Sequence, residues 1–406
     1  MAGRTVLVLG GGVGGLVTAN ESRRRLDRAD RVIVIEQARE HLFQPSLLWL
    51  MVGRRRRERI GRPLADILEP GVERVEAEIT RIDPGAKTVE TAGGSLTGDA
   101  IVVALGAQPD ADAVPGFREA AFDIFSPDGA EATAKALRES RGGRVVVAVG
   151  GLPYKCPAAP YEAALLIDDE FRRRGLRDVC TVEVYSPEPA PMPVAGPIMG
   201  RAVTALLEQK GIGFHPGSFV ERFEPTEKAI VFVDGARTPY DILAGIAPHR
   251  APAVVASSGL ANERGWIPVD PRTLETAHPG VFAIGDVTTI TLANGKPLPR
   301  AGVFAHGQGL TVARTIAARF AGTPPPKPFA GLGFCWVESG QGRAAFAAGD
   351  FYAEPDPTIE LRSPSRLLHL GKVAFERSWV GGRLERRLAR AALAAGSRSL
   401  GLHAEF

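Results

Sequence analysis

Cysteine is scarce in this chain. Its 406 residues contain three cysteines, Cys156, Cys180 and Cys335, and none of them forms a C-x-x-C pair. This is too few and too scattered for a disulfide scaffold, and the spacing predicts no zinc site or other metal centre. The thiols are therefore expected to be free or catalytic.

Long apolar runs are also missing. No stretch of 18 residues is both apolar and uncharged, so no membrane-spanning helix is predicted. The N-terminus reads as a strand leading into a glycine turn, so no signal peptide is expected. With 45% hydrophobic and 23% charged residues, the chain is expected to be globular, with two or three domains.

Positive charge is unevenly distributed. The net charge is only +3, yet the segment 361–406 holds nine Lys and Arg against three Glu. A second basic cluster, Arg54–Arg57 with Arg59 and Arg62, follows the apolar stretch LLWLMV. Basic residues beside apolar ones suit an anionic membrane surface better than nucleic acid, which is not an expected partner. A solvated arginine face is the alternative for each cluster.

A glycine-rich turn lies near the start. Val6–Leu9 reads as a strand, Gly10, Gly12 and Gly15 follow in the spacing G-x-G-x-x-G, and a helix is predicted to about Leu26. The first glycine permits a tight turn, the second lets the backbone approach a pyrophosphate, and the third lets helix and strand pack closely. The helix N-terminus would then face the phosphates.

A carboxylate stands in register with this turn. A second strand, Val32–Ile35, ends at Glu36, about 20 residues beyond the last glycine, where an acid accepts from a ribose hydroxyl. A lone glycine motif is weak, but strand, helix, second strand and acid together predict a dinucleotide.

Two later segments indicate which dinucleotide is bound. IVVALGAQPD, Ile101–Asp110, is a strand that ends in a turn at Gly106. GVFAIGDVTTI, Gly280–Ile290, is another, with Gly285 and Asp286 at its carboxyl end. These segments resemble those of flavoproteins with two dinucleotide-binding domains, the group of disulfide reductases and type II NADH dehydrogenases. The resemblance implies non-covalent FAD, with Asp286 accepting from a ribityl hydroxyl. A helix N-cap is the alternative role for Asp286.

A second strand-to-helix turn carries a thiol instead of a glycine cradle. Val145–Val149 reads as a buried parallel strand, and Pro160 marks the first turn of a helix. Between them lies GGLPYKCPAA, in which G-x-G-x-x-G is not completed. Lys155 and the positive end of the helix would favour the thiolate of Cys156. An inert buried cysteine is the alternative.

The other two cysteines lie on predicted strands. Cys180 alternates with Val182 and Val184 on one apolar face and is interpreted as structural. Alternation in GLGFCWVE puts Cys335 on the same face as Gly333, opposite Phe334, Trp336 and Glu338.

Four segments together resemble the sulfide:quinone oxidoreductases and the flavin subunit of flavocytochrome c sulfide dehydrogenase. They are GLPYKCPAAPYE, FQPSLLWLMVG, SPEPAPMPVAG and FCWVE, and the resemblance covers nearly the whole chain. It implies that Cys156 and Cys335 are a redox pair beside the flavin, assisted by Lys155, and that Glu162 accepts a proton. Stabilising the helix dipole is an alternative, compatible role for Glu162.

The resemblance also implies further cofactor contacts and some departures. Gln44 and Pro45 would contact the flavin, and Arg300 would take over a contact that a lysine makes in the family. The third cysteine of many members is missing from FDIFS, 122–126, which leaves the route of sulfur release open.

The predicted fold is α/β. It has a discontinuous Rossmann-like FAD domain (1–110 and 245–325), a second Rossmann-like domain with the redox cysteine (111–244), and a small C-terminal α+β domain (326–406).

The C-terminal domain is predicted to contain two helices. Ser363 is predicted to cap the first helix, and the second helix follows Gly381–Gly382. Amphipathic helices with arginines predict a membrane anchor, or else docking onto the protein's own core or a second copy. Phe346, Phe375 and Trp379 are candidates for flanking a quinone ring.

The sequence therefore predicts a peripheral flavoenzyme on the cytoplasmic side of the cell membrane that passes electrons from sulfide to a membrane quinone. A type II NADH:quinone dehydrogenase, a soluble sulfide dehydrogenase with a cytochrome partner, and a non-catalytic flavoprotein are the alternatives. A homo-oligomer is compatible with the sequence.

Overall fold

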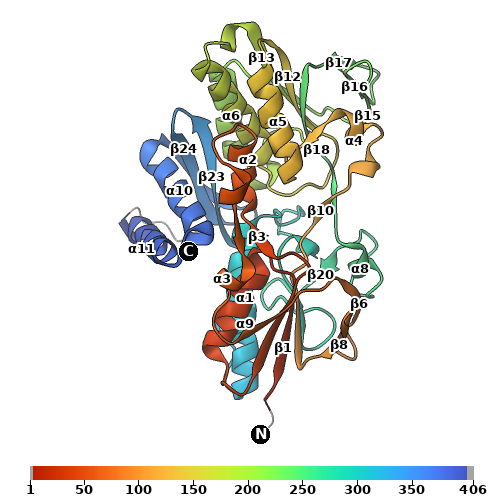
Figure 1. The fold of residues 1–406 in the computed structure, drawn as a ribbon, viewed down its shortest axis with the longest axis vertical. Helices are drawn as coiled ribbons and strands as arrows, with labels where there is room; N and C mark the ends of the chain where they lie inside the picture. The colour runs from red at the N-terminus through yellow and green to blue at the C-terminus, as the bar shows by residue number, and fades with distance from the viewer. Residues whose placement is uncertain (1–2, 400–406) are drawn as a thin grey trace.

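The computed structural model describes residues 3–399. Two five-stranded parallel sheets lie one above the other, and a third, antiparallel sheet with two helices lies along their side (Figure 1). The fold is α/β with two Rossmann-like units and a small C-terminal α+β unit, as predicted. The division at 110, 244 and 325 stays a proposal; one strand of the second sheet, Ile242–Ile246, crosses the position 244/245.

The first sheet holds the N-terminal glycine turn. Its order is β21 (Val281–Ala283), β9 (Ala100–Val103), β1 (Thr5–Leu9), β2 (Arg31–Ile35) and β5 (Val72–Val75). Helices α1 (Val13–Arg25) and α9 (Gly302–Ala321) lie side by side against it (Figure 1). After the first residue of β1 and of β2, the three central strands are apolar and buried, as expected of a parallel sheet covered on both faces.

The second sheet has the same architecture. Its order is β11 (Phe122–Asp123), β18 (Ile242–Ile246), β12 (Gly143–Val149), β13 (Cys180–Ser186) and β14 (Gly213–Pro216). Its helices are α5 (Pro127–Glu139), α6 (Ala159–Arg173) and α7 (Pro197–Gln209). Cys180 is buried in the core of this unit, which fits its structural interpretation.

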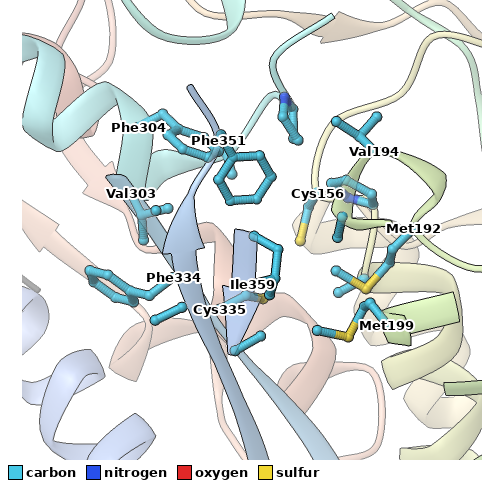
Figure 2. Close-up of a pocket in the computed structure, with 18 residues that line it drawn as sticks. Cys156, Met192, Val194, Met199, Val303, Phe304, Phe334, Cys335, Phe351 and Ile359 are labelled. Atoms are coloured by element: carbon cyan, nitrogen blue, oxygen red, sulfur yellow. The ribbon is translucent and has the colours of Figure 1, made fainter. Parts of the chain in front are cut away.

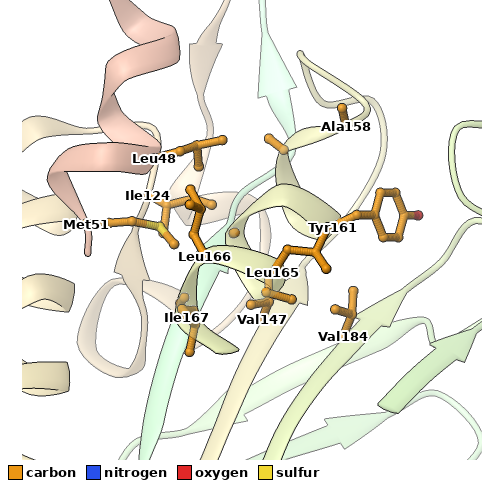
Figure 3. Close-up of a cluster of buried hydrophobic side chains, with 14 of the residues drawn as sticks. Leu48, Met51, Ile124, Val147, Ala158, Tyr161, Leu165, Leu166, Ile167 and Val184 are labelled. Atoms are coloured by element: carbon orange, nitrogen blue, oxygen red, sulfur yellow. The ribbon is translucent and has the colours of Figure 1, made fainter. Parts of the chain in front are cut away.

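The largest apolar cluster surrounds α6, which is buried from Ala159 to Phe171. Figure 3 shows Leu165, Leu166 and Ile167 of this helix among strand residues of the second sheet, with Leu48 and Met51 of the N-terminal unit against them. Helix α2 (Leu47–Leu50) thus ties the N-terminal unit to the second one.

This packing corrects the interpretation of the first basic cluster. The stretch 47–52 that precedes it is buried, so it offers no apolar surface to a membrane. The arginines also form ion pairs inside the protein: Arg54 with Asp169, Arg55 with Glu376 and Arg57 with Asp128 and Glu131. The cluster binds elements of the fold together.

The C-terminal sheet is β23 (Leu332–Gly340), β24 (Arg343–Asp350) and β25 (Thr358–Ser365), followed by α10 (Arg366–Val380) and α11 (Arg383–Ser399). The predicted cap at Ser363 is wrong by two residues, because 358–365 pair with β24 as a strand. Ser365 is the cap, and its hydroxyl accepts a hydrogen bond from the amide of Leu368 at 3.2 Å.

The remaining regular elements are short. They are β3 (Glu40–Leu42), β4 (Gly61–Pro63), β6 (Ile79–Asp83), β7 (Thr88–Thr91), β8 (Gly94–Thr97), β10 (Gln108–Pro109), β15 (Val220–Glu224), β16 (Ala229–Phe232), β17 (Arg237–Pro239), β19 (His249–Arg250), β20 (Ile267–Pro268), β22 (Thr288–Thr289), α3 (Leu64–Ile67), α4 (Phe117–Ala120) and α8 (Ala253–Ala256). Across residues 3–399, no helix has the length and apolar character needed to cross a bilayer.

Candidate active site

The glycine turn between β1 and α1 is open at only one of its three positions. Gly10 has φ +108°, and a Cβ there would meet the Ala104 carbonyl oxygen at 2.5 Å. A Cβ on Gly15 would meet the Gly10 carbonyl oxygen at 1.9 Å, whereas a Cβ on Gly12 would meet nothing within 4 Å. Two glycines are therefore needed for the turn itself, and the third leaves its backbone accessible to a ligand.

Two acidic side chains stand at the ends of strands near this turn. The carboxylate of Glu36, after β2, accepts hydrogen bonds from the amides of Gly11 at 2.7 Å and Ala38 at 2.8 Å. Asp286 follows β21 inside the short 3-10 turn η6 (Gly285–Val287), in which the N-cap position is Ile284. The alternative role of Asp286 as a helix cap is therefore wrong.

Arg300 and Gly285 shape the second half of the same site. The guanidinium of Arg300 donates from Nε to the Asp286 carbonyl oxygen at 3.0 Å and stacks over the Trp266 ring at 3.7 Å. Gly285, with φ +73°, donates its amide to the Gln308 side chain at 2.7 Å. Burial raises the pKa of Asp286, an effect that the charges of Lys155 and Arg300 oppose.

The other predicted cofactor residues border this region. Gly106 follows β9 with φ +67° and has open space where a Cβ would be. Gln44 and Pro45 form the 3-10 turn η1 (Gln44–Ser46) that leads into α2. Free backbone at a helix N-terminus and carboxylates at two strand ends fit FAD, which pairs an anionic pyrophosphate with hydroxyl-bearing sugars.

Cys156 and Cys335 line one cavity. Its volume is about 60 Å³, and its walls come from the turn before α6, from α7, from the start of α9 and from the C-terminal sheet. Figure 2 shows the two cysteines on this cavity with the thioethers of Met192 and Met199 and the ring of Phe351. Both thiols are free, and nearly all of the lining is apolar. The fold therefore brings together the two predicted redox cysteines.

The thiolate prediction for Cys156 is wrong for this structure. Burial raises the pKa of Cys156 to about 11 and raises that of Cys335 further, and the nearby carboxylate of Glu162 adds to both effects. Lys155 does not line the cavity. Its ammonium lies 3.4 Å from the Ala107 carbonyl oxygen and 5.4 Å from the centre of the Phe125 ring. Either thiol thus needs a neighbouring base to lose its proton.

Glu162 can serve as that base. It lies in the first turn of α6, is 3% exposed, and forms an ion pair with the ammonium of Lys372 from α10. Burial raises its pKa to about 7, while the pair with Lys372 acts in the opposite direction. A carboxylate with a pKa near neutrality is suited to exchanging protons at physiological pH.

Buried side chains fill the second strand-to-helix turn. The Tyr154 hydroxyl donates to the Glu188 carboxylate at 2.6 Å, and the Tyr161 hydroxyl donates to it at 3.3 Å. Tyr154 follows β12 and Glu188 follows β13, so both lie beyond the carboxyl ends of neighbouring strands. Open α/β sheets bind nucleotides there. A buried carboxylate at this position disfavours a second anionic pyrophosphate.

The aromatic candidates for quinone contact fall into two connected groups. Phe346 and Phe375 belong to a cluster with Phe334 and Trp336, where ring centroids lie 4.9 to 5.9 Å apart. Trp379, one turn along α10, instead packs on Phe43 at 6.4 Å and on His41 at 5.4 Å. Phe43 joins the two groups through an edge contact with Phe375 at 5.6 Å.

The sequence interpretation missed Lys372, Glu338 and His369. The last two form a pair in which His369 Nδ1 lies 2.8 Å from the carboxylate of Glu338. Alternation placed Glu338 on the strand face opposite Cys335, and it predicted no contact with α10. No local motif marks these residues, because the partners of Lys372 and Glu338 come from other elements.

Comparison with known proteins places the chain in a family. Residues 4–309 match the model of the pyridine nucleotide-disulphide oxidoreductases. The mitochondrial sulfide:quinone oxidoreductase of Mus musculus is 26% identical over 374 residues, which cover 87% of this chain and 80% of that protein. A sulfide-quinone reductase of Aquifex aeolicus is 27% identical over 394 residues, 92% and 90% of the two chains.

A further relative and a solved structure complete the comparison. A type II NADH:quinone oxidoreductase of Staphylococcus aureus is 26% identical over 333 residues, 77% of this chain and 82% of that one. The crystal structure of the Aquifex aeolicus sulfide:quinone oxidoreductase superposes with a TM-score of 0.83 at 24% identity, covering 98% and 94% of the two chains. The predicted resemblance is confirmed.

Proposed function

The chain belongs to the pyridine nucleotide-disulphide oxidoreductase family and is an oxidoreductase with FAD as its cofactor, and from this premise we propose that it oxidises sulfide and reduces a membrane quinone. The observation that supports this most is the shared cavity of Cys156 and Cys335, together with the charge of Glu162, which acts on both thiols. A sulfur pair with a neighbouring base matches sulfide chemistry more closely than hydride transfer.

The proposed roles follow from the contacts. Hydrosulfide attacks the oxidised Cys156–Cys335 pair, one cysteine sulfur gains the new sulfur–sulfur bond, and the other leaves as a thiolate. The proton of the hydrosulfide stays on the outer sulfur of the new persulfide until Glu162 takes it up, and the apolar walls exclude water from the persulfide. Bound FAD supplies the two-electron acceptor. Gly12, Glu36, Asp286 and Arg300 would hold it, with Gln44, Pro45, Gly106 and Gly285 around it.

Quinone is proposed to bind on the side of α10. The aromatic cluster of Phe334, Trp336, Phe346 and Phe375 lies between β23, β24 and α10, and flat rings of this kind suit a quinone head group. Trp379 would border the same region through Phe43.

Membrane contact is proposed through the outer faces of α10 and α11. Leu367 and Leu370 are 64% and 61% exposed, and Leu384 and Leu388 are 71% and 62% exposed. Helix α11 packs inward through Ala389 and Leu393, whereas Leu384 and Leu388 face outward beside exposed arginines. Such a surface suits an anionic lipid interface. Peripheral location on the cytoplasmic side stays a prediction.

The type II NADH dehydrogenase alternative is less well supported. The second turn offers no open glycine cradle, and Tyr154 and Glu188 fill the crevice where a dinucleotide would enter. Such an enzyme is also among the relatives of the chain.

An anaerobic titration tests the proposal. The FAD-loaded protein is mixed with sulfide in one cuvette and with NADH in another, and the flavin absorbance is followed. We expect bleaching by sulfide only, and recovery of the absorbance when a short-chain quinone is added. Bleaching by NADH without sulfide would favour the alternative, and bleaching by neither would contradict both functions.

A vesicle assay tests the membrane surface. The protein should sediment with anionic vesicles at low salt, and replacing Leu384 and Leu388 by glutamate should keep it in the supernatant. Sedimentation of that variant at the wild-type level would contradict the assignment of this face.

A further inference from the structure

Four titratable side chains form a chain from the cysteine cavity toward the protein surface. Glu162 and Lys372 are 3% and 6% exposed and lie at the inner end, next to the two thiols. Glu338 is fully buried, and the His369 side chain at the outer end is 24% exposed. Burial of ionisable groups is costly unless they are paired, and all four are paired here.

Hydrogen bonds and charge interactions link the four groups. The Lys372 ammonium donates to the Glu162 carboxylate, which also accepts a hydrogen bond from the backbone of Glu338. The charges of Glu162 and Glu338 hold the pKa of Lys372 above its usual range against the effect of burial. Nδ1 of His369 lies 2.8 and 3.0 Å from the two oxygens of Glu338.

The fold fixes this arrangement through two elements. His369 and Lys372 are three residues apart on α10 and therefore share one helix face. That face packs on β23, which carries both Cys335 and Glu338 (Figure 1). Both α10 side chains also contact the ring of Trp49, His369 edge-on at 6.2 Å and Lys372 with its ammonium at 5.0 Å.

We infer that Glu338 and His369 are the outer half of a proton path that connects the cysteine cavity with solvent. The inference rests on the proposed function, because sulfide must lose its proton in a cavity whose lining is apolar. The proton moves from the sulfhydryl to Glu162 and from there to Glu338, while the Lys372 ammonium keeps its charge between the two carboxylates. It then passes through the His369 ring to bulk water. Each step passes one proton along the chain and changes no redox state.

The test replaces His369 and offers a substitute base. In H369A, flavin reduction by sulfide should slow about tenfold, less than the roughly 10²-fold or more that a direct general base contributes, because His369 acts after the first transfer. Added imidazole should restore most of the rate. Pyrazole, which has nearly the same size but is a far weaker base, should restore none.

Controls separate the path from a structural role and from the proposed function. H278A, at a partly exposed histidine far along the chain, should reduce at the wild-type rate with or without imidazole. In E338Q, which keeps the shape of the side chain, the rate of flavin reduction should also fall. Imidazole should not restore this rate, because the proton path is then interrupted at a buried residue that imidazole cannot replace.

Three results would overturn the inference. They are a wild-type rate in H369A, equal rescue by imidazole and pyrazole, and a wild-type rate in E338Q. If sulfide failed to reduce the flavin of the wild-type protein, the proposed function itself would be contradicted. That result comes from the wild-type protein alone and is therefore distinct from the three results above.

Discussion

The two Rossmann-like units have the same sheet architecture but opposite turns after their central strands. In the first unit, the turn after β1 is backbone only and open at Gly12. In the second, the turn after β12 is filled by Tyr154 and Glu188 and ends in Cys156. We propose that the same position in two similar sheets serves a cofactor in one case and a sulfur nucleophile in the other. The family scaffold places a site, and the side chains in the turn decide its chemistry.

The strongest way to break this comparison is to remove the nucleophile. C156S and C335S should each abolish flavin reduction by sulfide while the protein stays yellow, because the sulfur pair can no longer form. Anaerobic stopped-flow absorbance measures the rate. C180S, at the buried structural cysteine, is the matched control and should reduce normally. Undiminished bleaching in both active-site variants would refute the scheme.

The next largest effect is expected for the base beside the thiols. E162Q should slow flavin reduction by about 10²-fold or more. The ionised carboxylate is the acceptor and its pKa is about 7, so the ratio of wild-type to E162Q rates should be small at low pH. It should rise through pH 7 and then level off. The ionisation of sulfide itself cancels in this ratio. A pH-independent ratio would exclude Glu162 as the base.

A pair of glycine substitutions tests whether only the first turn is open to the cofactor. G12V places a side chain in the cofactor space and should weaken FAD binding about 5- to 150-fold, the range that about 1–3 kcal/mol of overpacking produces. G151A is its counterpart in the second turn, where the new Cβ would meet Pro248 at an ordinary 3.5 Å, and should bind FAD normally. Equal losses in both variants, measured by flavin fluorescence, would show that the turns do not differ as described.

The smallest effect is expected for a variant that removes the hydrogen bond between Tyr154 and Glu188 in the second turn. Y154F removes a 2.6 Å hydrogen bond to the buried Glu188 and should lower the free energy of unfolding by about 1–3 kcal/mol. Y352F, which removes a 2.8 Å bond from a half-buried tyrosine to the Pro271 carbonyl, should cost less. Urea unfolding followed by circular dichroism compares the two. A Y154F protein as stable as wild type would mean that this bond does not hold the turn.

Local sequence patterns predicted both turns but not the network around the cysteines. The glycine spacing, Glu36 and Asp286 stand in continuous motifs, so their places followed from strand and helix periodicity. Cys335 was paired with Cys156 only through a resemblance. Lys372 reaches Glu162 from 210 residues away, a contact that no local pattern encodes. The thiolate prediction failed for a related reason, because burial of Cys156 and the direction of the Lys155 side chain depend on packing between units.

The central claim is that sulfur is carried by Cys156 and Cys335. The FAD-loaded protein is reduced anaerobically with one equivalent of sulfide, alkylated at once and digested, and the three cysteine peptides are weighed by mass spectrometry. The account predicts the mass of an added sulfur atom on the peptide of Cys156 or Cys335, and none on that of Cys180. A bleached flavin with no added sulfur on either active-site peptide would contradict it.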